Sequence, residues 1–212
     1  MIIAVDGPAA SGKGTVARAL ARHYNLPHLD TGLLYRAVGY TVRRLELDPR
    51  KEADAVAACD LDELTLADPA LRDDDVGQLA SIVSAHPLVR AALFQRQKRF
   101  ANQVGGAVLD GRDIGTVIAP DADAKLFVKA SAAVRARRRL AELTARGREV
   151  TYEQVLADIR ARDARDSARS TAPLTQAADA ASLDTSALSI DAAVARAVAL
   201  VEGRVRGRST AA

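Results

Sequence analysis

The stretch GPAASGKGT combines residue types that can bind phosphate, with Gly12 and Lys13 following Gly7 after four residues. Glycines let successive backbone N–H groups point at phosphate oxygens, and the N-terminus of a following helix adds its positive end. Lys13 could then reach the β- and γ-phosphates as a mobile point charge. A turn that only joined a strand to a helix would need no lysine at this offset. The pattern therefore predicts an ATP-binding phosphate loop formed by Gly7, Pro8, Ala9, Ala10, Ser11, Gly12, Lys13, Gly14 and Thr15.

Two residues are candidate ligands for Mg²⁺. Phosphate loops commonly place a Ser or Thr directly after the lysine, whereas here Gly14 intervenes and the hydroxyl comes at Thr15. This spacing counts against a GTPase switch or a motor ATPase. Further along, the apolar stretch AVLD ends in Asp110, and a carboxylate at the end of such a strand can hold Mg²⁺ directly or through water. Since parallel sheets bind ligands at the carboxyl ends of their strands, we expect Asp110 near the loop.

A predicted helix over 151–169 carries a stripe that begins apolar and ends charged. At helical spacing, Val155 and Ile159 are followed by Arg162, Asp166 and Arg169. The residues alone leave two interpretations open. The charged half could form i,i+4 salt bridges on a solvated surface, each worth roughly 0.2–0.5 kcal/mol. Alternatively, it could line a cleft with two arginines and a carboxylate.

The elements that must position these residues alternate between short apolar strands and helices. This alternation predicts a three-layer α/β/α fold around a five-stranded parallel sheet covered on both faces. The expected strands are 2–6, 26–30, 107–110, 124–128 and 182–185. The expected helices are 13–23, one from about residue 30, 87–104, 131–146, 151–169 and 189–205, and the C-terminal RGRSTAA is expected to fray.

Residues 47–85 interrupt the alternation. Pro49, Pro69 and an acidic run at 73–75 break this stretch into short segments with too few apolar residues for an independent core. We therefore expect a core formed by residues 1–46 and 86–212, with an insertion at 47–85.

The composition excludes several classes of protein. No stretch approaches the roughly 20 apolar residues that span a bilayer, and the N-terminus lacks the pattern of a signal peptide, so we expect a cytoplasmic location and no membrane partner. Cys59 is the only cysteine, which excludes an intramolecular disulfide.

Arginines concentrate between residues 135 and 169, and we expect most of them to form a solvated basic helix face. A phosphate-loop protein that binds nucleic acid is an alternative, but the net charge is only +3 and aromatic residues make up only 3%, which leaves few platforms for base stacking.

Several segments resemble those of the bacterial cytidylate kinases. Besides the phosphate loop, they are LDTGLLYR, LASIVSAHPLVR, DGRDIGTVI, RARDARDSAR and APLTQAADA, in the right order over nearly the whole chain. The resemblance implies a P-loop kinase that transfers the γ-phosphate of ATP to CMP or dCMP with Mg²⁺ as cofactor. It also implies that the insertion at 47–85 binds the nucleoside monophosphate (NMP) and that a small helical lid lies within about 135–170.

The resemblance implies roles for individual residues as well. In the catalytic set, it places Lys13, Arg112 and Arg165. The cytosine ring would be recognised by Ser81, Arg90 and Asp113, the CMP phosphate held by Arg36, Arg112 and Arg169, and the ribose contacted by Arg162 and Asp166, with Thr31 and Tyr35 lining the same pocket. Asp113 would accept a hydrogen bond from the exocyclic amine of cytosine, where uracil offers an acceptor instead.

One segment departs from the family pattern. Between Leu66 and Asp75 the chain has only ADPALRDD, where many members carry a longer insertion with short strands. Because Ser81 and Arg90 are retained, we expect the cytosine pocket to be present. The short insertion is expected to affect how this part of the site closes and how strictly it excludes UMP.

The acceptor of such a kinase is a phosphate, which is largely dianionic at neutral pH because its second pKa is about 6. No general base is therefore required. A kinase for a hydroxyl acceptor, with Asp113 recruited as the base, is an alternative that DGRD and RARDARDSAR argue against.

A kinase that closes two lobes over its substrates needs no partner subunit, so we expect a monomer.

Overall fold

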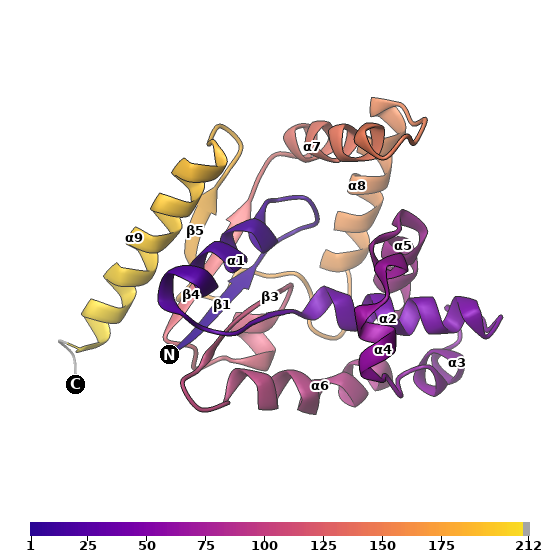
Figure 1. Ribbon diagram of the computed structural model, residues 1–212, viewed down its shortest axis with the longest axis horizontal. Helices are drawn as coiled ribbons and strands as arrows, with labels where there is room; N and C mark the ends of the chain where they lie inside the picture. Colours follow the sequence, from indigo (N-terminus) through magenta and orange to yellow (C-terminus); the bar gives the residue numbers. More distant parts are fainter. Residues whose placement is uncertain (210–212) are drawn as a thin grey trace.

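The computed structural model describes residues 1–209 and confirms the predicted α/β fold (Figure 1). Five parallel strands form one sheet in the order β2-β3-β1-β4-β5. Their bounds are β1 Ile2–Asp6, β2 His28–Asp30, β3 Ala107–Gly111, β4 Ala124–Lys129 and β5 Ala181–Asp184. β1 and β3 lie next to each other at the centre, so Asp6 and Asp110 both come to the carboxyl edge of the sheet.

Side chains alternate between the two faces of the sheet and pack against different helices. Ile3 and Val5 belong to a core with α1 (Lys13–Tyr24) and α9 (Ile190–Ser209). Ala4 and Leu109 belong to a second core with α6 (Pro87–Ala101) and the π-helical turn η2 (Ile114–Ile118). Helices therefore cover both faces, as the three-layer prediction requires.

The predicted bounds of several elements need correction. The second strand begins at His28 rather than residue 26, because Asn25 takes a left-handed conformation that ends α1 and the Leu26 N–H donates back to Ala21 O at 2.9 Å. The helix that begins at Pro87 ends at Ala101 rather than at residue 104, and Val104 is fully exposed. The last helix continues to Ser209, which corrects the expected fraying of RGRSTAA up to that residue; positions 210–212 lie outside the described residues.

Residues 47–85 hold only short helices. They are α3 Glu52–Ala57, α4 Glu63–Ala67, the 3-10 turn η1 Pro69–Arg72 and α5 Asp74–Val83. Their apolar side chains, such as Ala55 and Val83, share a core with Leu34 and Val38 of α2 (Thr31–Arg44) and with Val89 of α6. Among the described residues, this segment therefore has no separate core and is stabilised by packing against α2 and α6. Its small number of apolar residues predicts such a dependence on neighbouring elements.

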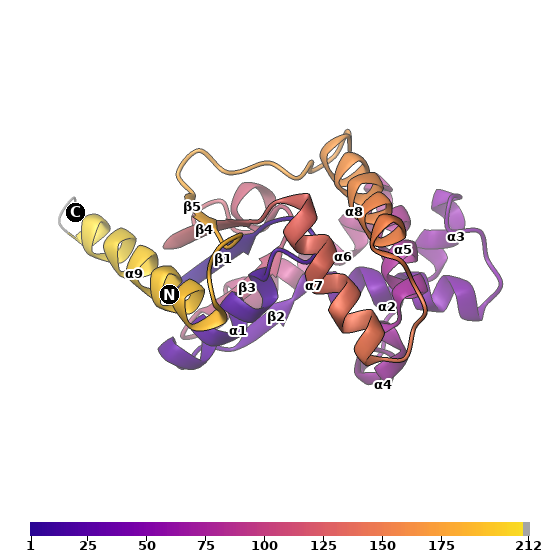
Figure 2. The same ribbon diagram turned by 90° about the horizontal axis from the view of Figure 1, so that it is seen from above.

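Two helices, α7 (Ala132–Ala145) and α8 (Tyr152–Ser167), pack on each other beyond the carboxyl ends of the strands (Figures 1 and 2). Ser131 caps α7, and Thr151 with Gln154 forms a capping box at the start of α8. Between residues 1 and 209, no helix is long and apolar enough to cross a membrane.

Candidate active site

A large cavity of about 1010 Å³ lies at the carboxyl edge of the sheet, between the phosphate loop, α2, α5 and the α7–α8 pair. Most of the residues expected to bind nucleotides line it: Ala9, Ala10, Ser11, Gly12, Lys13, Gly14, Thr15, Thr31, Tyr35, Arg36, Arg90, Arg112, Asp113, Arg162, Asp166 and Arg169. Five expected residues are not among the lining ones: Gly7, Pro8, Ser81, Asp110 and Arg165.

The phosphate loop has the close backbone packing that its glycines allow. A Cβ atom on Gly7 would lie 2.1 Å from the carbonyl oxygen of Val128, so a side chain cannot be accommodated there. Gly12 has a left-handed φ of 87° and leads directly into α1, which begins at Lys13. The N-terminus of a twelve-residue helix therefore opens onto the cavity.

Gly14 explains the unusual spacing of the loop. A Cβ atom at this position would lie 3.2 Å from Oδ2 of Asp110, which is tighter than most real contacts. Asp110 itself is 1% exposed, and its Oδ1 has no hydrogen-bond partner among residues 1–209; His28 Nε2 lies 3.7 Å away. The missing side chain at Gly14 thus leaves room for a buried carboxylate directly beside the first turn of α1.

Lys13 is held in an environment that disfavours its charge. Burial, together with the nearby charge of Arg112, lowers the pKa of Lys13 to about 8, although Asp110 and Asp30 act in the opposite direction. Bound phosphates would raise it again, because they stabilise the ammonium.

This shift predicts a pH dependence. Since kcat/KM reports the free enzyme, kcat/KM for ATP should decline as the pH rises above about 8, where Lys13 loses its proton. Initial rates at low ATP between about pH 6 and pH 10 would measure it. A Lys13→Arg variant, whose guanidinium stays charged throughout this range, should be slower but lack the decline. A wild-type kcat/KM for ATP that stays constant up to pH 10 would contradict the role of the Lys13 ammonium in binding ATP.

In the wall of the cavity, Arg90 and Asp113 form an ion pair between α6 and the segment that follows β3. Both side chains are almost completely buried. The guanidinium of Arg90 also lies 5.5 Å from the ring centroid of Tyr35. Arg90 therefore lies in the same pocket wall as Asp113 and Tyr35.

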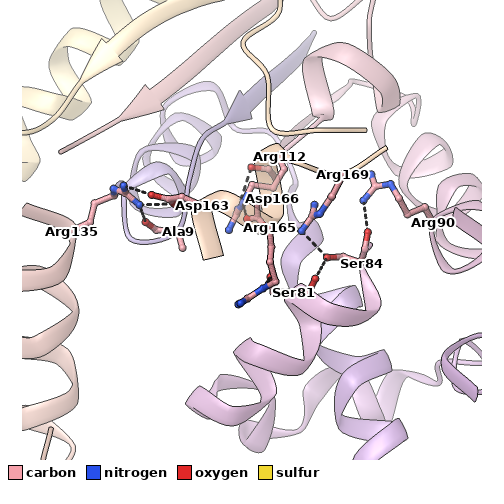
Figure 3. Close-up of polar contacts among 11 residues, drawn as sticks. Ala9, Ser81, Ser84, Arg90, Arg112, Arg135, Asp163, Arg165, Asp166 and Arg169 are labelled. Carbon is pink, nitrogen blue, oxygen red and sulfur yellow. Dashed lines mark hydrogen bonds and ion pairs between the residues drawn. The ribbon is translucent and has the colours of Figure 1, made fainter. Parts of the chain in front are cut away.

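Asp166 organises a second charged cluster, drawn in Figure 3. Its Oδ2 accepts from Arg112 Nε at 2.8 Å, and its Oδ1 accepts from Arg169 Nη2. Burial raises the pKa of Asp166, but the charges of Arg112, Arg169 and Arg162 outweigh this effect and hold the pKa below its usual value. Asp166 is only 1% exposed, so the charged half of the stripe lines the cleft. The alternative of a solvated salt-bridge surface is wrong.

Arg162 lines the cavity without an ion pair of its own in the part of the chain described. Burial and the charge of Arg112 lower the pKa of Arg162 to about 9, and its Nε has no partner there. A buried guanidinium among other arginines is costly unless an anion neutralises it. This end of the cavity is therefore built to receive a negatively charged group.

Two expected residues contact protein groups beside the cavity. Arg165 is exposed and donates to Ser81 Oγ and Gln78 Oε1, both at 3.3 Å. Arg36 lines the cavity and donates to the carbonyl oxygens of Leu71 and Asp73, which links α2 to the insertion.

Sequence reasoning missed several residues that shape the site. Asp6 is buried, and its two carboxylate oxygens accept from the N–H groups of Ile114 and Gly115, each at 2.8 Å. These bonds fix the segment that carries Arg112 and Asp113. Burial raises the pKa of Asp6 to about 7 against the lowering effect of the two hydrogen bonds. The only signal in the sequence was a carboxylate at the end of an apolar strand.

Ser84 and Arg135 were missed too. The Oγ of Ser84 accepts from Arg169 Nη2 at 2.8 Å and donates to the Ser81 carbonyl, while the Ser84 carbonyl accepts from Arg90 at 3.3 Å. Arg135, expected on a solvated basic helix face, is 5% exposed and contacts the phosphate loop through the Ala9 carbonyl. Neither position carries a local signal, because its partners lie far away in the chain.

The chain is similar to known proteins in sequence and in fold. A family model described as cytidylate kinase matches residues 3–203. Cytidylate kinases from Xanthobacter autotrophicus and a Methylobacterium species are 62% and 58% identical over 98% of this chain and 100% of their own length. A crystal structure of an uncharacterized protein from Eubacterium ventriosum has the same fold, with a TM-score of 0.56 and 16% identity over 96% of this chain and 98% of that chain. The chain therefore belongs to the cytidylate kinase family.

Proposed function

We propose that this enzyme transfers the γ-phosphate of ATP to CMP or dCMP, giving ADP and CDP or dCDP. One observation carries the proposal: a phosphate loop and a buried Arg–Asp pair line the same cavity. A cavity of about 1010 Å³ is large enough for two nucleotides whose phosphates meet in the middle. Membership of the cytidylate kinase family supports the same reaction.

The donor end would bind ATP through the loop from Gly7 to Thr15. The backbone N–H groups of the loop and the N-terminus of α1 would contact the phosphates, and Lys13 would reach the transferred group. Arg112 borders both ends and would stabilise the charge that develops during transfer, together with Arg165 if that exposed side chain turns inward.

The acceptor end would bind CMP through the two charged clusters. Asp113 and Arg90 would recognise the edge of the cytosine ring with Ser81, while Arg36, Arg112 and Arg169 would hold the phosphate. Arg162 and Asp166 would contact the ribose, with Thr31 and Tyr35 beside them.

Because the incoming oxygen belongs to a phosphate that is already ionised, the chain needs to position and neutralise the reactants but not to remove a proton.

Thr15 and Asp110 fit a Mg²⁺ ion. Asp110 has a buried carboxylate oxygen without a hydrogen-bond partner among the described residues, and Mg²⁺ is usually held by one or two carboxylates together with substrate phosphates and water. Residues 1–209 contain no group of three or more His, Cys, Asp or Glu side chains that could hold a metal. The ion would neutralise charge on the β- and γ-phosphates when it is bound.

We also propose that residues 47–85 form the NMP-binding insert and that α7 and α8 form the lid within about 135–170, around a core of residues 1–46 and 86–212. The enzyme would act as a cytoplasmic monomer on small molecules, without nucleic-acid or membrane partners.

The test is an initial-rate assay of ADP release with ATP and Mg²⁺, run in parallel with CMP, dCMP, UMP and AMP. Strong preference for CMP and dCMP is the expected result, and excess EDTA should abolish it. Comparable turnover of UMP would leave the enzyme a kinase but contradict the cytosine assignment. No release of ADP with any of the four acceptors would overturn the proposed reaction and favour a kinase for a hydroxyl acceptor.

A further inference from the structure

Arg135 links three segments that are far apart in the sequence. Its guanidinium binds the carboxylate of Asp163 at two points, with Nη1–Oδ1 at 2.9 Å and Nη2–Oδ2 at 2.6 Å. The Nε donates to the Ala130 carbonyl at the end of β4 at 2.9 Å, and Nη1 also donates to the Ala9 carbonyl in the phosphate loop at 3.3 Å (Figure 3). One nearly buried side chain thus joins α8, the sheet edge and the phosphate loop.

Neither member of this pair is among the residues that line the cavity. Asp163 lies on α8 directly after Arg162 and one turn before Asp166, both of which do line it. Arg135 is only 5% exposed. The pair is therefore not part of the cavity wall, but it ties the helix that carries the charged side chains to the phosphate loop.

A second set of contacts ties the same helix to the acceptor end. Asp166 binds Arg112 from the β3 segment, and Arg169 just beyond α8 donates to Ser84 at the end of α5. These contacts do not involve Arg135. Losing the Arg135 pair should therefore leave the acceptor pocket assembled but remove the direct contact between α8 and the phosphate loop.

We infer that the Arg135–Asp163 pair is a positioning element that holds the acceptor phosphate in line with the donor phosphate; this rests on the phosphoryl transfer proposed above. A buried ion pair is weak support for stability alone. Its two parallel hydrogen bonds do, however, impose a specific geometry, and a displacement of about 1 Å can cost about 100-fold in rate.

The experiment uses Arg135→Lys, which keeps the charge but loses the two-point contact, and Asp163→Asn, which keeps the shape. In each variant kcat should fall about 10-fold to 100-fold, while the Kd for CMP without ATP, from calorimetry, stays within about twofold of wild type. Because the residues act as a pair, the double variant should lose little more than the worse single variant. Asp179→Asn, which breaks the Lys125–Asp179 ion pair elsewhere, is the matched control and should keep wild-type kcat.

Three results would overturn the inference. They are unchanged kcat in both variants, a weakening of CMP binding as large as the loss of kcat, and single-variant losses that multiply in the double variant. The wild-type assay separates this failure from that of the proposed reaction, because a wild-type enzyme that does not phosphorylate CMP contradicts the reaction itself. Folded protein is verified by comparing the Tm of every variant with that of Asp179→Asn.

Discussion

Replacing Lys13 by Met should reduce kcat by about 100-fold to 1,000-fold while the Kd for CMP changes less than about twofold. Lys13 lies at the start of α1 in the cavity wall, among the phosphate-loop residues. Its ammonium would act on charge that develops on the transferred phosphate, so its loss affects the transition state more than the binding of CMP. Stopped assays for kcat and calorimetry for CMP would measure the two quantities.

The matched control is Lys98→Met, which removes one positive charge from an exposed position on α6. This variant should keep wild-type kcat, since Lys98 is remote from the residues that line the cavity. Turnover by Lys13→Met at the wild-type rate would remove Lys13 from catalysis. A parallel loss of CMP affinity would show that the substitution disturbs the whole site.

The second large effect concerns the choice of base. Changing Asp113 to Asn should lower the ratio of kcat/KM for CMP to that for UMP by about 10-fold to 100-fold. A hydrogen bond to a charged group is worth about 1.5–3 kcal/mol, and the amide NH₂ of Asn can donate to the uracil carbonyl where the carboxylate cannot. Asn is preferable to Ala here because Arg90 is buried beside Asp113 and would otherwise keep only its hydrogen bond to the Ser84 carbonyl.

The ratio is measured by competition between CMP and UMP in one reaction, together with the KM for ATP. The KM for ATP should stay within about threefold of wild type, since Asp113 lies outside the phosphate loop and pairs with Arg90 of α6. Asp179→Asn serves again as a control for the loss of one carboxylate. A CMP-to-UMP ratio equal to that of wild type would contradict the role of Asp113.

The parts of the fold that the sequence predicts well are those with local signals. β1 and the phosphate loop follow directly from an apolar run and a glycine pattern, and β3 with Asp110 follows from the same logic. The sequence also predicts the stripe on α8, but it does not predict whether the charged half of that stripe faces solvent or lines a cleft. Whether Asp166 faces water or a cleft depends on Arg112, which lies 54 positions earlier in the chain.

The residues that were missed share this dependence on distant partners. Asp6 meets the N–H groups of Ile114 and Gly115 more than one hundred positions away, and Arg135 meets Ala9 across 126 positions. The concentration of arginines between residues 135 and 169 predicted a basic face that included Arg135, and only the packing of α7 against α8 and the loop buries it. Periodicity describes one element at a time, so contacts among three elements cannot be derived from it.

The central claim is that one cavity brings the γ-phosphate of ATP to the phosphate of CMP. The most direct measurement follows the label of γ-³²P-ATP during incubation of the enzyme with Mg²⁺ and CMP. The label should appear in CDP, in a stoichiometric ratio to ADP, and should not appear when Lys13→Met replaces the wild type over the same time. Label recovered as inorganic phosphate, or no CMP-dependent loss of label from ATP, would contradict the claim.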